Sequence, residues 1–265
     1  MEAAGVGISL TGVFEATGTS DPRRLIDWVR GVGVRWIQLD GTMAGTRARE
    51  LDRSARRDLA ASIRRSDLGL TGIDMLIPPG HLTNATHQDR AVAALSGAIE
   101  LAGELGRLLG STDAMVVAVD LPPNLVVDVA SQLDSVAANA GVLVADHHRP
   151  AAARPAIGLI GTGIDPAAMI AAGEDVFDTL TRMPGPIIQA RLSDTAGGAR
   201  VTAGSGDGSL DLVEYASALG VQRYSRPVVA DLRGLREPMT AAGRVVNAWR
   251  RATGLGMAGE ITAAG

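Results

Sequence analysis

Short apolar segments alternate with longer amphipathic segments along most of the chain, and this alternation predicts strands that each lead into a helix. The apolar segments are VGISL, RWIQLD, LTGIDMLI, AMVVAVD, GVLVAD, AIGLIG, IIQARL and PVVADL, at residues 6–10, 35–40, 70–77, 114–120, 141–146, 156–161, 187–192 and 227–232. Strands that alternate with helices form a parallel sheet, and eight of them match the closure of a (β/α)8 barrel. The expected fold is therefore α/β, a single (β/α)8 TIM barrel.

The segments between these strands carry helix start and stop signals. Residues 21–33 begin with Asp21 as N-cap and Pro22 at the first helical position, and they end in the sequence GVG. Apolar residues at helical spacing predict further helices over 89–106, 124–141 and 211–220. The sixth unit, residues 165–183, is expected to hold one or two short helices interrupted by Gly173.

Length and composition favour one domain. The chain has 265 residues, of which 46% are hydrophobic, enough for one sizeable core. No linker, low-complexity tract or internal repeat divides it. We expect the barrel to span residues 1–252 and the Ala/Gly-rich tail 253–265 to fray.

Charge and cysteine content indicate which kinds of partner and which cellular compartment to expect. Twenty-five Lys plus Arg stand against 29 Asp plus Glu, a net charge of −4, so no large basic field attracts nucleic acid. The chain has no cysteine, which suits a reducing compartment. The N-terminal residues lack a secretion signal, and no run reaches the roughly 20 apolar residues that span a bilayer. The expectation is a cytoplasmic protein that binds neither membranes nor nucleic acid.

Charged residues follow most of the predicted strands, where a parallel barrel has its active site. They are Asp40, Asp120, Asp146, His147, His148, Asp165, Arg191, Asp194, Asp231 and Arg233. Carboxylates that converge on one barrel mouth repel one another unless a cation, an arginine or shared protons compensate. Mg²⁺ and Mn²⁺ prefer such oxygen-rich sites and tolerate a histidine.

Three segments carry a family resemblance: AIELAGELG at 98–106, IIQARLSD at 187–194 and GSGDGSLDLVEYASAL at 204–219, the last followed by PVVADLRG at 227–234. In this order and spacing they resemble the xylose isomerase-like TIM barrels, a family that includes sugar phosphate isomerases and epimerases and the related endonuclease IV proteins. The resemblance covers most of the chain. It implies a divalent metal held by a carboxylate or histidine from each of strands 5 to 8, which polarises a sugar oxygen while carboxylates move a proton.

Carried onto this sequence, the resemblance places the metal-binding positions at or near Asp146, Asp165, Arg191 and Asp231, and a further histidine position at Ala168. Arginine has no lone pair to give to a metal, so Arg191 removes one ligand and brings a positive charge. Asp in place of Glu at 231 shortens the reach by one methylene.

Two hypotheses follow for the barrel mouth. In the first, Asp146, His148, Asp165 and Asp231 bind Mn²⁺ or Mg²⁺, and Arg191 holds a substrate group. In the second, Arg191 replaces the metal as electrostatic partner of the carboxylates, and no cofactor is required. The catalytic candidates are Asp146, Asp231 and Arg191, and the candidates for substrate binding are Arg191, Arg233, Asp194 and Asp40.

Structural roles compete with these assignments. Asp146 and Asp231 are equally well read singly as solvated strand ends or caps, and Asp194 as the cap of the turn that follows it. His147 and His148 are adjacent, so in an extended segment at most one of them faces the mouth.

The function expected from these features is sugar or sugar phosphate isomerisation or epimerisation by proton transfer at a sugar carbon, with a sugar-like small molecule as partner. An endonuclease IV-like nuclease requires many His and Glu ligands and a basic face, and this chain has four His and a net negative charge. The alternative is a non-catalytic or metal-independent ligand-binding barrel that has lost the family's metal site.

Overall fold

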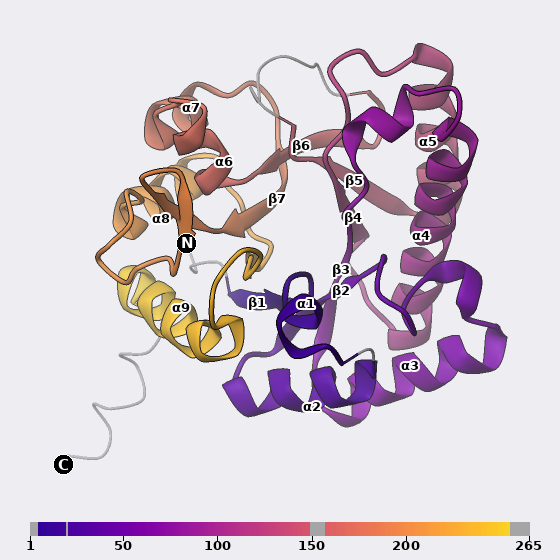
Figure 1. The fold of residues 1–265 in the computed structure, drawn as a ribbon, viewed down its shortest axis with the longest axis horizontal. Helices are drawn as coiled ribbons and strands as arrows, with labels where there is room; N and C mark the ends of the chain where they lie inside the picture. Colours follow the sequence, from indigo (N-terminus) through magenta and orange to yellow (C-terminus); the bar gives the residue numbers. More distant parts are fainter. Residues whose placement is uncertain (1–4, 20, 149–156, 255–265) are drawn as a thin grey trace.

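The computed structural model describes residues 5–19, 21–148 and 157–254. Eight parallel strands close into a barrel in the order β1-β10-β7-β6-β5-β4-β3-β2, and the helices surround it (Figure 1). The barrel strands are β1 Val6–Ser9, β2 Trp36–Asp40, β3 Gly69–Met75, β4 Met115–Val119, β5 Val142–Asp146, β6 Ile160–Ile164, β7 Ile187–Leu192 and β10 Val228–Ala230. The predicted single (β/α)8 barrel is confirmed.

The helices fill the connections between the strands. They are α1 Val13–Thr17, α2 Pro22–Val32, α3 Arg53–Arg65, α4 Gln88–Leu109, α5 Val127–Ala140, α6 Pro166–Ala171, α7 Val176–Arg182, α8 Leu212–Val221 and α9 Pro238–Thr253, with short 3-10 helices η1 Ala48–Glu50 and η2 Pro79–Leu82. None of the helices in the described ranges is long and apolar enough to cross a membrane.

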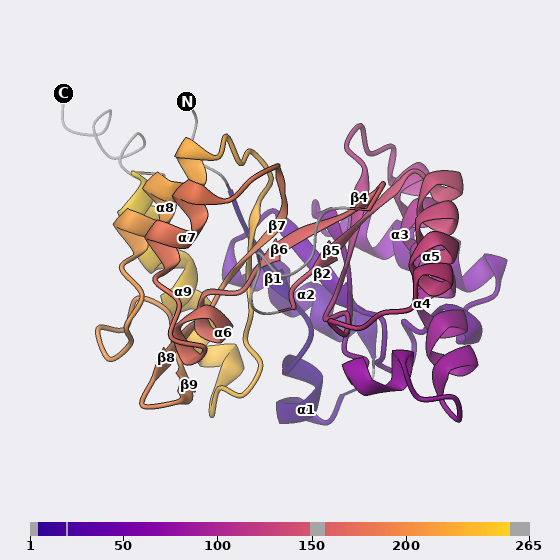
Figure 2. The same ribbon diagram turned by 90° about the horizontal axis from the view of Figure 1, so that it is seen from above.

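A small antiparallel hairpin interrupts the regular alternation after β7. Its strands are β8 Asp194–Ala196 and β9 Ala199–Val201. Figure 2 shows the hairpin and α1 at the same end of the barrel. Both follow the carboxyl end of a barrel strand, so this end is the mouth.

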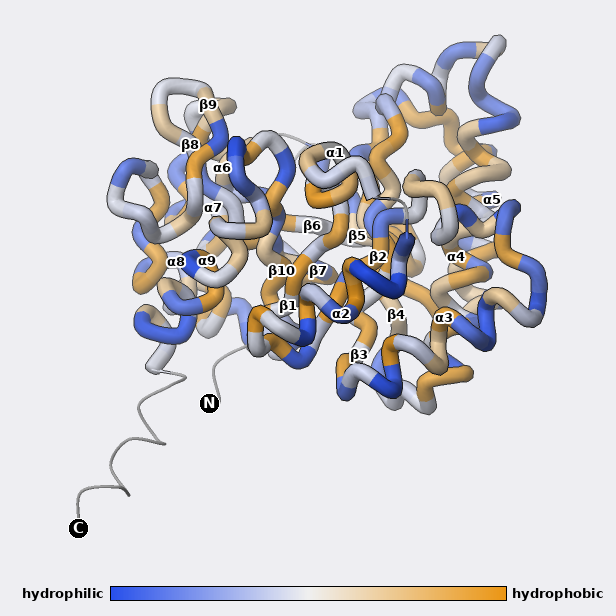
Figure 3. Tube along the Cα trace, turned by 60° about the horizontal axis from the view of Figure 1, so that its bottom comes forward, coloured by the Kyte–Doolittle hydropathy of each residue, from blue (hydrophilic) through white to orange (hydrophobic). Residues whose placement is uncertain are grey.

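Apolar burial follows the predicted pattern. Figure 3 shows hydrophobic residues concentrated on the strands and hydrophilic ones on the outer turns of the helices. In α2, apolar residues at helical spacing form the inward face: Leu25, Ile26 and Val29 are buried, whereas Trp28 is only partly buried. Asp21 caps this helix by accepting a hydrogen bond from the Arg23 N–H, and Gly33 ends it in the left-handed conformation.

Two predicted boundaries are wrong for identifiable reasons. The sixth strand begins at Ile160 rather than at residue 156, because Ile157 and Ile160 pair across a tight turn that has Gly158 at φ 54°. Helix α4 continues through Gly106, where a side chain would press on Met115 of β4, and it ends at Gly110 in the left-handed conformation. Glycine at 106 therefore serves close helix–strand packing rather than helix termination. Of the tail expected to fray, all but Thr253 and Gly254 lies outside the described residues.

Gly72 on β3 has a conformation that only glycine adopts readily. Its φ is 150°, and the register between β2 and β3 shifts beside it. A Cβ at this position would lie 1.8 Å from the carbonyl oxygen of Val116 on β4. Because that oxygen belongs to the neighbouring strand's backbone, it cannot move away without breaking the barrel ladder.

We expect Gly72→Ala to lower the free energy of unfolding by more than about 3 kcal/mol. The added Cβ would overlap the Val116 carbonyl oxygen, and alanine would also be strained at this backbone conformation. Chemical denaturation checks this. Gly243→Ala is the matched control, because Gly243 lies within α9 with no atom near its Cβ position; there alanine should stabilise by roughly 0.5–1 kcal/mol. Equal stability of wild type and Gly72→Ala would refute the assigned register.

Candidate functional site at the barrel mouth

Arg191 lies buried at the carboxyl end of β7 and bridges two aspartates. Its Nη2 donates to Oδ1 of Asp74 at 2.9 Å, and its Nη1 donates to Oδ2 of Asp165 at 3.2 Å. All three side chains are 3% exposed. Asp74 belongs to β3 and Asp165 follows β6, so this guanidinium joins distant parts of the barrel wall.

Two further arginines complete an ionic network around Asp231, which follows β10. Arg233 makes a bidentate pair with Asp231, through Nε to Oδ1 at 2.9 Å and Nη2 to Oδ2 at 2.6 Å. Arg200 donates from Nη1 to Oδ2 of Asp231 at 2.7 Å and from Nη2 to Oδ2 of Asp165 at 2.9 Å. We call Asp74, Asp165, Asp231, Arg191, Arg200 and Arg233 the mouth network; its formal charges balance.

Local structure fixes the members of the network. The β8-β9 hairpin folds back after β7 and thereby brings Arg200 over the mouth. Ser193 donates from Oγ to Oδ1 of Asp165 at 2.6 Å and accepts from the N–H of Ala167. Tyr215 of α8 donates its hydroxyl to the carbonyl oxygen of Arg191 at 2.8 Å. Ser193 thus orients the carboxylate of Asp165, and Tyr215 fixes the backbone of Arg191, although neither residue belongs to the network.

The arginines keep Asp165 and Asp231 ionised. Burial by itself would raise the pKa of Asp165, but Arg191 and Arg200 hold that pKa well below its usual range. Burial likewise opposes ionisation of Asp231, and Arg233 and Arg200 again lower the pKa well below the ordinary value. Carboxylates held in this way are weak proton acceptors at neutral pH.

Asp40 at the end of β2 has the opposite character. Burial raises its pKa above the ordinary value, and the nearby charge of Asp74 raises it further, against hydrogen bonds that Oδ1 accepts from Thr42. Asp40 is paired in register with Asp74 on β3. The mouth therefore combines strongly ionised carboxylates with one that holds its proton more readily.

Exposure separates the groups that a ligand can reach from those that support them. The side chain of Asp120, 3.9 Å from Nη1 of Arg191, is 40% exposed, Arg200 is 25% exposed and Arg233 is 16% exposed. Arg191 is 3% exposed. A molecule at the mouth therefore meets Asp120, Arg200 and Arg233 first, and Arg191 lies beneath them.

The fifth strand presents a different residue from the one predicted. His147 points into the barrel, where its Nε2 lies 3.2 Å from Oε1 of Gln189 on β7. Gly163 on the intervening β6 leaves the space, since a Cβ there would lie 2.7 Å from the His147 ring. Because neighbouring residues of an extended chain point to opposite faces, Asp146 points away from this interior. Its Oδ1 accepts hydrogen bonds from the N–H groups of Leu121 and His148.

Asp194, a substrate-binding candidate, holds a loop together. Its Oδ1 accepts hydrogen bonds from the backbone N–H groups of Thr195, Ser209 and Leu210, at 2.7, 3.0 and 3.0 Å. The side chain is buried and lies against Gly208. These contacts match the structural alternative, a turn cap.

Of the four predicted metal ligands, the structure brings together only Asp165 and Asp231, which share Arg200. Asp165 and Asp231 accept from three guanidinium groups, Asp146 accepts from backbone N–H groups, and among the described residues no three His, Asp or Glu side chains are placed to hold a metal ion. A dication between Asp165 and Asp231 would meet three positive charges. The donor set present here does not fit a divalent metal.

Sequence reasoning missed two members of the mouth network. Asp74 stands inside the apolar segment 70–77, so it was counted within a strand that in fact ends at Met75. The aspartate in this segment is nevertheless a signal, because a central strand rarely buries an unpaired carboxylate. Arg200 belongs to the hairpin, whose fold-back no local pattern predicts.

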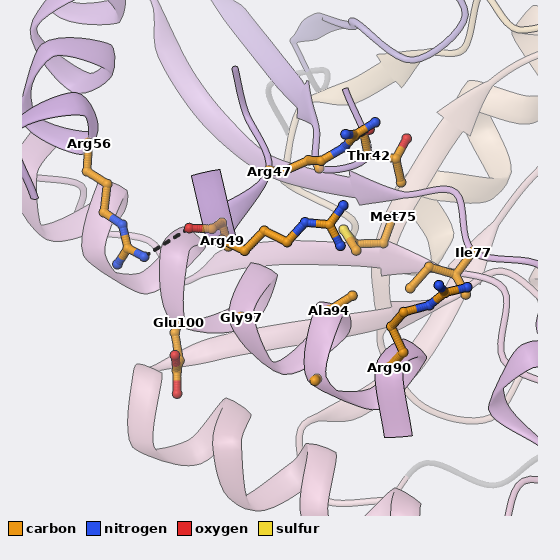
Figure 4. A pocket seen from close by; sticks show the side chains of 13 residues that line it. Thr42, Arg47, Arg49, Arg56, Met75, Ile77, Arg90, Ala94, Gly97 and Glu100 are labelled. Atoms are coloured by element: carbon orange, nitrogen blue, oxygen red, sulfur yellow. Dashed lines mark hydrogen bonds between the residues drawn. The ribbon is translucent and has the colours of Figure 1, made fainter. Parts of the chain in front are cut away.

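A pocket of about 620 Å³ lies beside the mouth, between the ends of β2 and β3, η1 and the first turns of α4. Figure 4 shows the arginines that line it. Gly41 and Thr42 follow Asp40 directly, and Met75 follows Asp74. The pocket thus shares a wall with the mouth but includes none of the mouth network.

We expect Asp231→Asn to cost about 3 kcal/mol of unfolding free energy at pH 7, because it leaves Arg200 and Arg233 without their buried partner. Since the pKa of Asp231 is lowered on folding, its contribution is present above pH about 4 and lost as pH falls further, so the variant should lose less stability in acid than wild type. Urea denaturation from pH 7 to 3 measures both. The control Asp178→Asn breaks an exposed pair with Arg182 and should change stability by under about 0.5 kcal/mol. If the free energy of unfolding fell equally in wild type and in Asp231→Asn as the pH decreases, the result would contradict the ionised state of Asp231.

No protein-family model matches the sequence, and no curated protein matches it either. Solved structures match over nearly the whole chain. A xylose isomerase domain protein from Planctomyces limnophilus shares 16% identity at a TM-score of 0.67, covering 96% of this chain and 97% of its own. The D-psicose 3-epimerase of Clostridium cellulolyticum H10, solved with D-tagatose, shares 12% identity at a TM-score of 0.67, covering 95% and 98%.

A probable 3-DHS dehydratase involved in petrobactin synthesis, from Bacillus anthracis, shares 11% identity at a TM-score of 0.62, covering 93% of this chain and 99% of its own. These identities are low, so the likeness is one of fold. At that level the resemblance read from the sequence is confirmed: the chain has the fold of the xylose isomerase-like TIM barrels.

Proposed function

We propose that the barrel mouth binds a small polyhydroxylated, sugar-like molecule and transfers a proton at one of its carbons, with arginines in place of a metal ion as the electrostatic partners. The observation that carries this proposal is the mouth network, in which Arg191, Arg200 and Arg233 neutralise the carboxylates that a metal would otherwise bind. The shared fold with sugar epimerases supports the substrate class.

Asp40 is the proposed proton carrier. A general acid or base works best when its pKa lies near the working pH. Burial and Asp74 raise the pKa of Asp40 toward that range, whereas the pKa of Asp231, the earlier candidate, is lowered. The N–H and hydroxyl of Thr42 donate to Oδ1 of Asp40, and the backbone N–H of Met43 also bonds this carboxyl group, so its position is fixed.

Arg200 and Arg233 are the proposed partners of the charge that develops when a proton leaves a carbon next to a carbonyl group. The resulting enediolate carries negative charge on oxygen, and preorganised guanidinium groups stabilise such a charge in a site with little water. Both arginines are held by Asp231. Arg191 acts as a positioning residue, because it is buried and fixes Asp165 and Asp74.

A non-catalytic ligand-binding barrel is the second candidate. One observation favours it: both oxygens of Asp231 accept from arginines, and those of Asp165 accept from arginines, Ser193 and a backbone N–H. Carboxylates held in this way suit a rigid recognition surface as well as a catalytic one. In this case polar ligands would bind at Asp120, Arg200 and Arg233 without exchange of a carbon-bound proton.

We expect Asp40→Asn to lower solvent exchange of the substrate's carbon-bound hydrogen by about 10²–10⁴-fold, because asparagine keeps the acceptor for Thr42 but cannot take a proton. Proton NMR in D2O, with ketohexoses and their epimers as the panel, follows the exchange. Asp58→Asn, on the exposed face of α3, should leave the rate unchanged. Substrate binding without any exchange in wild type would instead establish the ligand-binding barrel.

We expect Mn²⁺, Mg²⁺, Co²⁺ and Zn²⁺ to leave the melting temperature of the dialysed protein unchanged, because a cation at the mouth must displace three arginines. Thermal-shift titration and metal analysis measure this in wild type and in Asp231→Ala. A stabilising shift in wild type that Asp231→Ala abolishes would restore the metal-binding hypothesis.

A further inference from the structure

The pocket beside the mouth has an arginine-rich lining with a marked imbalance of charge. Arg47, Arg49, Arg56 and Arg90 line it, and Glu100 is the one acid among its lining residues. Figure 4 shows Glu100 well apart from the guanidinium groups of Arg49 and Arg90. The end of the pocket near Met75 and Ile77 is therefore positively charged.

Two of these arginines already have partners. Arg47 pairs with Glu50 at 3.0 Å, and Arg56 pairs with Glu104 at 2.6 Å and donates to the carbonyl oxygens of Leu51 and Ala48. They shape the pocket wall and their charges are compensated.

Arg49 and Arg90 differ from them. Neither makes a hydrogen bond or a close ion pair with any residue in the described ranges. Arg47 lowers the pKa of Glu50 most, and the charge of Arg49 adds only weakly to this effect. Arg49 projects from η1 and Arg90 from the first turn of α4, so opposite walls supply the two charges. A cation in the first turn opposes the helix dipole, so the position of Arg90 does not serve the stability of α4.

The rest of this end of the pocket is apolar or small. Met75, Ile77, Ala93 and Ala94 line it. Volumes of roughly 300–1,000 Å³ are typical of small-molecule sites, in which a few polar groups orient a ligand against apolar walls. Two guanidinium groups of this kind recognise a carboxylate or a phosphate, because their paired N–H donors match its oxygens.

We propose that this pocket is a binding site for a small organic anion, with Arg49 and Arg90 holding its phosphate or carboxylate group and Met75 and Ile77 packing against its body. The site is separate from the mouth network and does not rest on the proposed proton transfer. The shared wall through Thr42 and Met75 places it next to Asp40 and Asp74.

Isothermal titration calorimetry with glucose 6-phosphate, glucuronate and glucose tests the proposal, since the three share one ring and differ in charge. We expect one or both charged sugars to bind saturably at low salt, and glucose, which lacks the anionic group, to show no binding that depends on Arg49 or Arg90. Binding of only one of them assigns the anion as phosphate or as carboxylate. Absence of binding by both would overturn the proposal.

Variants then locate the binding. Arg49→Gln and Arg90→Gln should each weaken it by about tenfold or more, as expected for loss of a charge-assisted contact, and the double variant should abolish it. Arg57→Gln removes an exposed arginine of α3 outside the pocket and should change affinity less than twofold. Because Arg49, Arg57 and Arg90 are exposed, all four variants should fold.

The mouth is the competing location. If Arg200→Gln abolishes binding of the charged sugar and Arg49→Gln and Arg90→Gln leave it unchanged, the anion binds at the mouth and the pocket proposal is wrong. Equal loss in Arg57→Gln and in the pocket variants would indicate unspecific attraction and would also overturn it.

Discussion

The buried ion pairs of Arg191 constrain the whole mouth of this barrel. A guanidinium that is 3% exposed would be costly to bury alone. It is stable there because Asp74 and Asp165 approach it from opposite parts of the barrel wall, and Ser193 and Tyr215 fix the geometry. With Arg191 in this position, Asp165 and Asp231 are held ionised and both carboxylates face arginines. The charge balance of the mouth therefore depends on where Arg191 lies.

An arginine and a divalent metal ion give a site different chemistry. A divalent ion brings two charges and open coordination positions, whereas a guanidinium brings one charge and fixed N–H directions. Arg191, Arg200 and Arg233 together balance three aspartates. The groups that remain outside this balance are Asp40 and Asp120, one buried and one exposed.

Glycines decide how much room the barrel interior has. Gly163 admits the contact between His147 and Gln189, and Gly72 lets β3 pass close to the backbone of β4. The structure requires glycine at both positions, because a Cβ at either would overlap its neighbours. The two glycines allow a polar interior with a buried histidine below the mouth, in a family of folds whose barrels are usually filled by branched apolar residues.

The sequence by itself determined the barrel, since apolar periodicity and cap residues are local signals; it also indicated Asp40, Asp165, Arg191, Asp231 and Arg233 as strand-end charges. It could not assign their partners. Asp74 was hidden in an apolar segment, Arg200 reaches the mouth only through the hairpin, and Asp146 and Asp194 bind backbone N–H groups. Pairing across a barrel depends on strand register and on the closure of loops that are distant in sequence, so only the tertiary structure decided which charges meet.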